Sequence, residues 1–150
     1  LLHGFLTERY VDSADYIVKV PAGLHHLHVL VEPMSCVAKA VQQAWEAQRR
    51  LRVWSPRRAF VVGAGQIGLL ATMALRLRGL QVWTLARSRK PTRNSQIVEA
   101  LGAEYVSLSE TTLPELVARV GKADLILDAS GSSQVAFRCM EALGHNGVLV

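Results

Sequence analysis

The sequence predicts an α/β fold, a doubly wound parallel sheet with helices on both faces. The strongest observation is residues 60–68, Phe-Val-Val-Gly-Ala-Gly-Gln-Ile-Gly, where an apolar run leads into three glycines and an apolar-rich segment, 67–77, follows. That order is typical of a buried strand that turns sharply into a helix. In the rest of the chain, strand-like and helix-like segments alternate with short connections, which favours a parallel sheet.

Before the glycine turn, the pattern predicts a strand, a loop and a long helix. Residues 16–20 alternate enough to form a strand that ends at Pro21. The segment 25–28 carries three histidines, but a metal site needs further convergent ligands, so we expect a solvated loop. Residues 33–50 place apolar side chains at helical spacing and polar ones on the other face, which predicts one amphipathic helix.

The remaining elements are predicted from the same patterns and from the glycine and proline residues at their ends. Gly102 closes one helical segment, and Pro114 stands where another helix begins. The predicted strands are 80–85, 104–107, 124–128 and 147–150, and the predicted helices are 93–101, 114–120 and 132–143. Together with the strand before the glycine turn, these strands make five of the usual six of a doubly wound sheet.

The glycine spacing carries the first indication of function. In a strand-turn-helix unit, Gly63 permits the tight turn, Gly65 lets a pyrophosphate approach the backbone, and Gly68 lets the helix pack closely on the strand. The helix that starts at Gln66 and Ile67 offers free N–H groups and partial positive charge to the phosphates. We therefore predict a dinucleotide site at these five residues of a Rossmann fold. The alternative is an ordinary loop in a glycine-containing chain.

The end of the second predicted strand indicates which dinucleotide binds. An NAD site of this fold has an acidic residue about 20 positions after the turn, whereas residues 80–96 contain no carboxylate. Arg87 can pair with a 2′-phosphate, Ser88 can donate to it, and Arg89 adds positive charge. This predicts NADP in preference to NAD, with NAD still possible. The alternative is a solvated basic loop.

The end of the fourth predicted strand should lie beside the same ligand. Ligands of this fold lie outside the carboxyl ends of the strands, so Ser130 and Gly131 are expected near the cofactor ribose. Asp128 is interpreted as a strand-end cap rather than a catalytic group.

Composition limits the function classes. The chain has 150 residues, half of them hydrophobic, and can bury one core. Its net charge of +5 is explained by a phosphorylated ligand, because no nucleic-acid motif accompanies the charge. No apolar run reaches the roughly 18 residues that span a bilayer, and Cys36 and Cys139 lack metal-type spacing, so a cytoplasmic protein with reduced thiols is expected. The termini suggest a piece of a longer protein.

The residues also resemble a known family, the zinc-dependent medium-chain dehydrogenases, and within it the glucose dehydrogenases of archaeal type. Order and spacing both fit over nearly the whole chain. The matching segments are Gly4, Phe5, Glu8 and Tyr10, then 15–21, 31–33, 61–68, 79–83, 87–92, 128–131 and 144–149. The resemblance implies that an aldose is oxidised at its anomeric carbon to a lactone while hydride passes to NAD(P), with zinc lowering the pKa of the sugar hydroxyl.

The family resemblance implies a role for Glu32. This residue matches the glutamate that the family places beside zinc, as a metal ligand or as a hydrogen-bond partner of substrate and bound water, and would thus be a catalytic, metal and substrate residue. From the residues alone, Glu32 before Pro33 is equally a helix-start carboxylate. Cys36 stands where close relatives often carry an acidic residue, and Ser88 replaces the second arginine of the NADP-binding pair.

The resemblance also implies a domain organisation. Residues 1–32 would be the end of a catalytic domain whose Cys and His zinc ligands lie outside this chain, and residues 33–150 would be a Rossmann domain that stops before its last strand. The full-length protein is expected to be a homo-oligomer, with a sugar as substrate and neither nucleic acid nor membrane as partner. Three alternatives remain: another polyol dehydrogenase, a zinc-free quinone reductase of the same superfamily, or a non-catalytic nucleotide-sensing module.

Overall fold

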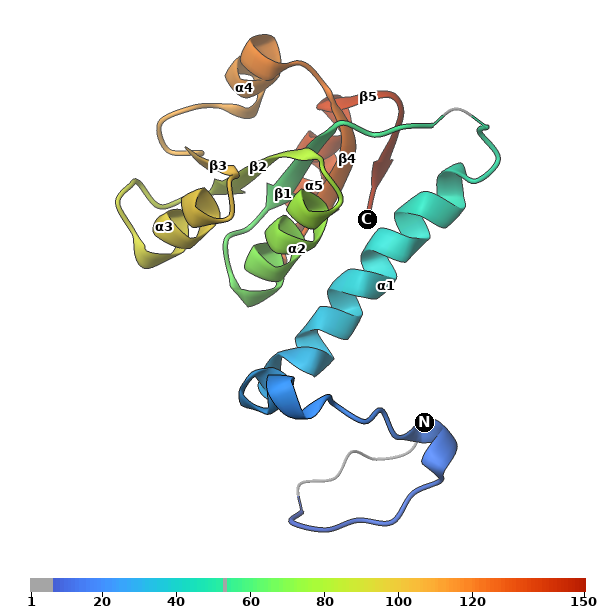
Figure 1. Ribbon diagram of the computed structural model, residues 1–150. Helices are drawn as coiled ribbons and strands as arrows, with labels where there is room; N and C mark the ends of the chain where they lie inside the picture. The colour runs from blue at the N-terminus through green and yellow to red at the C-terminus, as the bar shows by residue number, and fades with distance from the viewer. Residues whose placement is uncertain (1–6, 53) are drawn as a thin grey trace. The chain divides into compact units, whose positions relative to one another are not determined.

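The computed structural model describes residues 7–52 and 54–150, so Gly4 and Phe5 of the resemblance lie outside the described residues (Figure 1). The chain divides into two compact units, Leu1–Val31 and Glu32–Val150. In the first unit, two 3₁₀ helices are described, η1 (Ala14–Tyr16) and η2 (Ala22–Leu30). The helices that follow are α1 (Val31–Gln48), α2 (Gln66–Leu77), α3 (Arg93–Ala100), α4 (Leu113–Val120) and α5 (Ser133–Glu141).

A five-stranded parallel sheet forms the centre of the Glu32–Val150 unit. Its strands are β1 (Arg58–Val62), β2 (Gln81–Ala86), β3 (Glu104–Ser107), β4 (Ala123–Asp128) and β5 (Leu143–Leu149). They lie in the order β3-β2-β1-β4-β5, and every pair is parallel (Figure 1). The chain therefore crosses the sheet between β3 and β4, and β1 and β4 meet at the switch point. The predicted doubly wound fold is confirmed.

Helices cover both faces of the sheet because successive strand side chains point to opposite faces. In β1, Ala59 and Val61 pack in one core cluster with residues of α1, α2 and α3. Phe60 and Val62 pack in the other cluster with residues of α4 and α5. The side chains at these four positions are at most 2% exposed, which is the burial expected of a central parallel strand.

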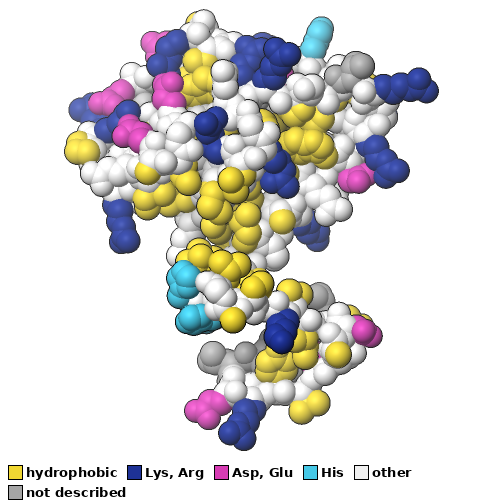
Figure 2. Space-filling model, in the orientation of Figure 1, with side chains coloured by type: hydrophobic (Ala, Val, Ile, Leu, Met, Phe, Trp, Pro, Cys, Tyr) yellow, Lys and Arg dark blue, Asp and Glu magenta, His cyan; other side chains and the backbone are white. Residues whose placement is uncertain are grey.

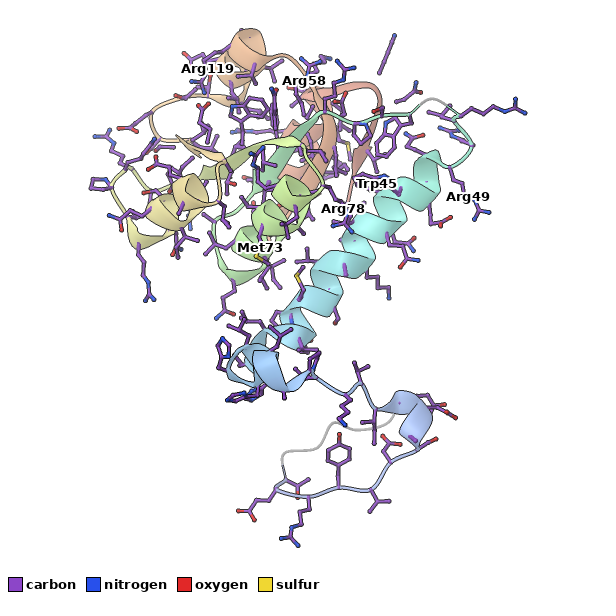
Figure 3. All side chains as sticks on the ribbon, viewed as in Figure 1. Trp45, Arg49, Arg58, Met73, Arg78 and Arg119 are labelled. Carbon is purple, nitrogen blue, oxygen red and sulfur yellow. The ribbon has the colours of Figure 1, made fainter. Side chains whose placement is uncertain are left out.

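The long helix α1 joins the first of these layers. Its buried positions Val37, Val41, Ala44 and Gln48 follow the helical period that the sequence predicted. Near its end, Trp45 lies beside Arg78 at the end of α2, with the guanidinium carbon 6.0 Å from the ring centroid (Figure 3). This cation–π contact joins α1 to the helix that follows the glycine turn.

The predicted strand at 16–20 is wrong. Residues 14–16 form η1, started by Ser13, whose hydroxyl accepts a hydrogen bond from Asp15 N, and residues 17–20 have no regular structure. The described residues offer this segment no partner strand, and a strand needs one to satisfy its backbone groups. The loop predicted at 25–28 is also wrong, because this segment lies within η2. Its three histidines are exposed, as expected.

The elements after the glycine turn lie close to their predicted positions, with two differences at the end. β3 has the predicted bounds, whereas α5 stops at Glu141 and β5 begins at Leu143 rather than 147. The register between β4 and β5 shifts near Ala123, and Asn146 has φ 55°. This irregularity hides the early part of β5 from a simple strand pattern.

Local signals explain why the helices start where they do. Thr112 caps α4 and exchanges hydrogen bonds with Glu115, and the backbone N–H and hydroxyl of Thr112 hold the pKa of that carboxyl below its usual value. Thr92 and Ser95 form the equivalent box on α3. Within the residues described, no helix combines the length and apolarity needed to cross a membrane.

Candidate nucleotide-binding site

The glycine turn follows β1 directly, and its first glycine is required by backbone geometry. Gly63 has φ 105°, and its N–H donates to the carbonyl of Leu85 on β2 at 2.7 Å. A Cβ at this position would lie 2.8 Å from the backbone oxygen of Ala129, which follows β4. Gly63 is therefore enclosed by the ends of β2 and β4, and only glycine fits there.

The third glycine sets how closely α2 approaches the turn. A Cβ on Gly68 would lie 1.8 Å from the carbonyl oxygen of Gly63. A side chain would push the first turn of the helix away from β1. The structure thus confirms the close packing that the spacing predicted for Gly68.

The second glycine faces open space. A Cβ on Gly65 would meet no atom within 4 Å, and Gly65 is the exposed N-cap of α2 with no side-chain capping bond. Gln66 is exposed and Ile67 half-buried in the first turn that follows. Free backbone N–H groups, the positive end of the helix and room above Gly65 fit a pyrophosphate. Asn94 braces this turn, because its side-chain amide donates to the carbonyl of Ala64 at 2.7 Å.

The basic side chains of the loop after β2 differ in whether they have an acidic partner. Arg89 Nε lies 3.7 Å from Glu110 Oε1, and Lys90 Nζ lies 2.7 Å from Glu99 Oε1. Arg87 is exposed, and its guanidinium makes no hydrogen bond or ion pair to any residue that the structure describes. Of these three basic side chains, Arg87 is thus the one whose charge no acidic partner offsets.

The loop after β4 completes the same edge of the sheet. Val62 pairs with Asp128 in register, and Ala129 N donates to the carbonyl of Val62 at 2.8 Å. Asp128 Oδ1 accepts a hydrogen bond from Ser130 N at 2.8 Å, which agrees with its interpretation as a strand-end cap. Ser130 and Gly131 are both exposed beyond this cap.

The structure therefore places ten predicted cofactor residues at the carboxyl ends of three adjacent strands. They are Gly63, Gly65, Gln66, Ile67 and Gly68 after β1, Arg87, Ser88 and Arg89 after β2, and Ser130 and Gly131 after β4. Asn94 was not predicted, because no local pattern reveals a contact across 30 residues of sequence.

An apolar cavity of about 830 Å³ lies on the face of the sheet that α4 and α5 cover. Val62 and Leu85 line it from the ends of β1 and β2, while Leu113 and Val135 line it from the helices. The cavity also includes Cys139, where burial, and secondly the charge of Asp128, raises the pKa of the thiol to about 11. Such a cavity at strand ends can accept a flat apolar ring.

The side-chain hydrogen bonds described for Glu32 go to its helix neighbours Ser35 and Cys36 and not to the ten predicted cofactor residues. It occupies the first turn of α1, it is exposed, and its carboxylate lies 3.9 Å from Cys36 Sγ. Its backbone carbonyl accepts a hydrogen bond from Ser35 Oγ at 2.6 Å. Residues 7–52 and 54–150 contain no group of three possible metal ligands, and Glu32 is the residue to which the family resemblance assigns a metal role.

Charge is spread over the visible surface rather than concentrated. On the face that Figure 2 shows, acidic side chains stand among the Lys and Arg side chains of the Glu32–Val150 unit.

Comparisons with known proteins agree with this geometry. Residues 25–150 match the family described as "Glucose dehydrogenase C-terminus". The glucose 1-dehydrogenase of Methanocella arvoryzae is 39% identical over 148 residues, which is 99% of this chain and 41% of that protein. Glucose 1-dehydrogenase 1 of Caldivirga maquilingensis is 39% identical over 149 residues, with the same coverage. The chain thus spans about two fifths of the length of these relatives.

A solved structure is similar over nearly the whole chain. Glucose dehydrogenase from Haloferax mediterranei, in complex with NADP, Zn and gluconolactone, aligns with a TM-score of 0.88 and 32% identity, over 98% of this chain and 42% of that one. L-idonate 5-dehydrogenase from Escherichia coli aligns with a TM-score of 0.68 at 23% identity and supports the fold alone.

Proposed function

The chain belongs to the glucose dehydrogenase family whose C-terminal region it matches, and from this premise we propose that it is the cofactor-binding part of an NADP-preferring, zinc-dependent glucose or aldose 1-dehydrogenase. The proposed reaction transfers hydride from sugar C1 to NAD(P) and gives a lactone. When bound, NADP would accept that hydride, and the protein would contribute its binding and orientation.

The observation that carries the cofactor proposal is the unpaired guanidinium of Arg87. It stands at the end of β2, where NAD enzymes of this fold carry a carboxylate. An arginine can form two parallel hydrogen bonds with a phosphate, and its positive charge attracts that group. Arg89 and Lys90 are already engaged with Glu110 and Glu99, so they add less.

The rest of the cofactor would follow the edge of the sheet. The pyrophosphate is proposed to lie over Gly65, where the N–H groups of Gln66 and Ile67 can donate to it. The ribose would lie near Ser130 and Gly131. The apolar cavity beside Val62 and Leu85 is suitable for an adenine ring.

Glu32 is proposed as one member of the catalytic site, as a zinc ligand or as a hydrogen-bond partner of substrate and bound water. A carboxylate is a suitable zinc ligand, and the Haloferax mediterranei relative binds Zn and gluconolactone. The other ligands would come from a catalytic domain, of which residues 1–32 are proposed to be the end and after which residues 33–150 form the cofactor domain.

We further propose a cytoplasmic homo-oligomer that binds neither nucleic acid nor membranes. β5 is the outer strand of the described sheet and leaves an edge that a further strand or a neighbouring subunit can pair with. Light scattering of the full-length protein measures its mass directly, and a monomer would contradict the oligomer.

The test is calorimetric titration of the full-length protein with NADP and with NAD at low salt. We expect NADP to bind more than about tenfold tighter, or ~1.4 kcal/mol. Arg87→Ala should remove most of this preference by weakening NADP alone. The matched control is Arg89→Ala, which should change the preference less, because that guanidinium already faces Glu110. Equal loss of NADP and NAD affinity in Arg87→Ala would contradict the assignment.

Turnover of aldoses decides the substrate class. Full activity with less than one zinc per subunit would favour a quinone reductase, for which Glu32 has no metal role. Tight NADP binding without reduction by any aldose or polyol would favour a nucleotide-sensing module.

A further inference from the structure

The backbone of the basic loop is held by side chains of the neighbouring strand. The hydroxyl of Tyr105, on β3, donates to the carbonyl of Ser88 at 2.9 Å. The hydroxyl of Ser109, just after β3, donates to the carbonyl of Arg87 at 2.9 Å. Two successive carbonyl groups of the loop are therefore fixed by two side chains that are distant in sequence.

Ser107 in turn contacts Ser109. Ser107 Oγ lies 2.9 Å from Ser109 Oγ and 3.5 Å from the carbonyl oxygen of Arg87. Each hydroxyl has one proton. Since Ser109 has the shorter contact with the carbonyl and gives its proton there, Ser107 donates to Ser109. The result is a chain of hydrogen bonds from Ser107 through Ser109 to Arg87 O.

This support is built into the sheet. Tyr105 is 3% exposed and Ser107 is 4% exposed, so solvent competes little for their hydroxyls. The N–H of Leu108 donates to the carbonyl of Ala86 at 2.8 Å and extends the pairing of β2 with β3 to the start of the loop. The backbone that carries Arg87 is thus ordered before any ligand binds.

These hydrogen bonds end on the carbonyl groups of Arg87 and Ser88 and do not involve the side chains of those two residues. Fixing a backbone costs conformational entropy, and a loop that is already fixed does not pay this cost when it binds a ligand. This gain in affinity applies to the group that the loop is proposed to bind, the 2′-phosphate of NADP. The proposed pyrophosphate site lies after β1, at Gly65, and does not depend on the order of this loop.

We propose that Tyr105 and the Ser107–Ser109 pair are positioning residues for cofactor selectivity. By holding the carbonyls of Arg87 and Ser88, they keep the Arg87 guanidinium where it meets the 2′-phosphate. The inference rests on the proposed function, and it adds three residues of β3 and its following loop to the determinants of NADP preference.

The test compares three variants of the full-length protein. Tyr105→Phe and Ser109→Ala each remove one hydroxyl, and Ser109→Thr retains it. Dissociation constants for NADP and NAD are measured by calorimetry, and thermal unfolding is recorded for each variant. We expect Tyr105→Phe and Ser109→Ala to weaken NADP about three- to tenfold, the range of one hydrogen bond, and to leave NAD unchanged. Ser109→Thr should restore the preference.

Arg119→Ala is the matched control. The Arg119 side chain, labelled in Figure 3, pairs with Glu104 at the start of β3, away from the loop. Its loss should leave the ratio of the two dissociation constants unchanged, although it too removes a contact to β3.

The outcomes separate the inference from the proposed function. A wild-type protein that binds NADP and NAD equally would overturn the cofactor assignment and this inference with it. A wild-type preference that survives in both Tyr105→Phe and Ser109→Ala would overturn the inference alone. Equal weakening of both cofactors would show a purely structural role and overturn it as well.

Discussion

The hydroxyl of Thr84, on β2, lies 2.7 Å from the hydroxyl of Thr72, on α2, and both side chains are fully buried. Thr72 gives its own proton to the carbonyl of Gly68 at 2.8 Å, so Thr84 is the donor to Thr72. The two bonds tie the second strand to the first turn of the helix whose N-terminus faces the proposed cofactor.

Replacement of Thr84 tests this relay, the hydrogen bonds that lead from Thr84 through Thr72 to the carbonyl of Gly68. Thr84→Val has nearly the same shape but leaves a buried oxygen of Thr72 without its donor. We expect the free energy of unfolding to fall by about 1–2 kcal/mol, as measured by urea denaturation. Thr84→Ser keeps the hydroxyl and should lose less. Equal stability of wild type and Thr84→Val would mean that the relay contributes nothing.

Gly65→Ala should impair binding without unfolding the protein. The added Cβ meets no protein atom within 4 Å, but it enters the space proposed for the pyrophosphate. We expect the affinity for NADP to fall at least about tenfold, while the free energy of unfolding changes by less than about 1 kcal/mol, the cost of a poorer N-cap. Calorimetric titration and urea denaturation measure the two quantities. Unchanged NADP affinity would refute the proposed phosphate position.

Gly68→Ala should behave differently, because its Cβ collides with the carbonyl of Gly63. Neither backbone can move alone, so α2 must shift away from β1. We expect a loss of about 3 kcal/mol or more of stability, together with loss of cofactor binding. A stable Gly68→Ala variant would show that the helix has more freedom than the structure indicates.

The two cysteines should differ in reactivity. Cys36 is exposed, whereas Cys139 is buried and its pKa is raised to about 11. At pH 8, iodoacetamide should therefore modify Cys36 at least about tenfold faster, because the thiolate is the reactive species. Peptide mass spectrometry assigns each modified site. Comparable rates in the native protein would contradict the burial of Cys139.

The same pKa predicts a dependence of stability on pH. The folded state keeps the Cys139 proton, while the unfolded chain loses it near the ordinary pKa of 9.0. The stabilisation is complete below pH 9.0 and is lost as the pH rises to about 11, because the unfolded chain then binds fewer protons. Urea denaturation at pH 8 and 10 measures it. Cys139→Ala should lack this part of the decline.

Local sequence was enough for several features of the site. Gly63 and Gly68 have the roles that their spacing predicted, since a turn and a close helix contact depend on neighbouring residues. Asp128 caps its own loop by bonding Ser130 N, two residues away. The contact of Gly68 with Gly63 and the cap at Asp128 each join residues a few positions apart, so they need no knowledge of the rest of the chain.

Other features depend on contacts that the sequence pattern does not show. The sequence singled out Arg87, from its position after β2, as the main determinant of NADP preference, but it did not show which of the basic side chains would have an acidic partner. Only the folded chain brings Glu110 to Arg89 and Glu99 to Lys90 and leaves Arg87 unpaired.

By itself, the sequence determined the parallel α/β class, the glycine turn and the basic end of β2, because hydrophobic period and turn chemistry act within a few residues. The tertiary structure decided which charge stays available and which residues hold it. Tyr105 is 17 residues from Ser88, and Asn94 is 30 from Ala64. The tertiary structure also decided against the strand at 16–20, since a strand exists only where another backbone lies beside it.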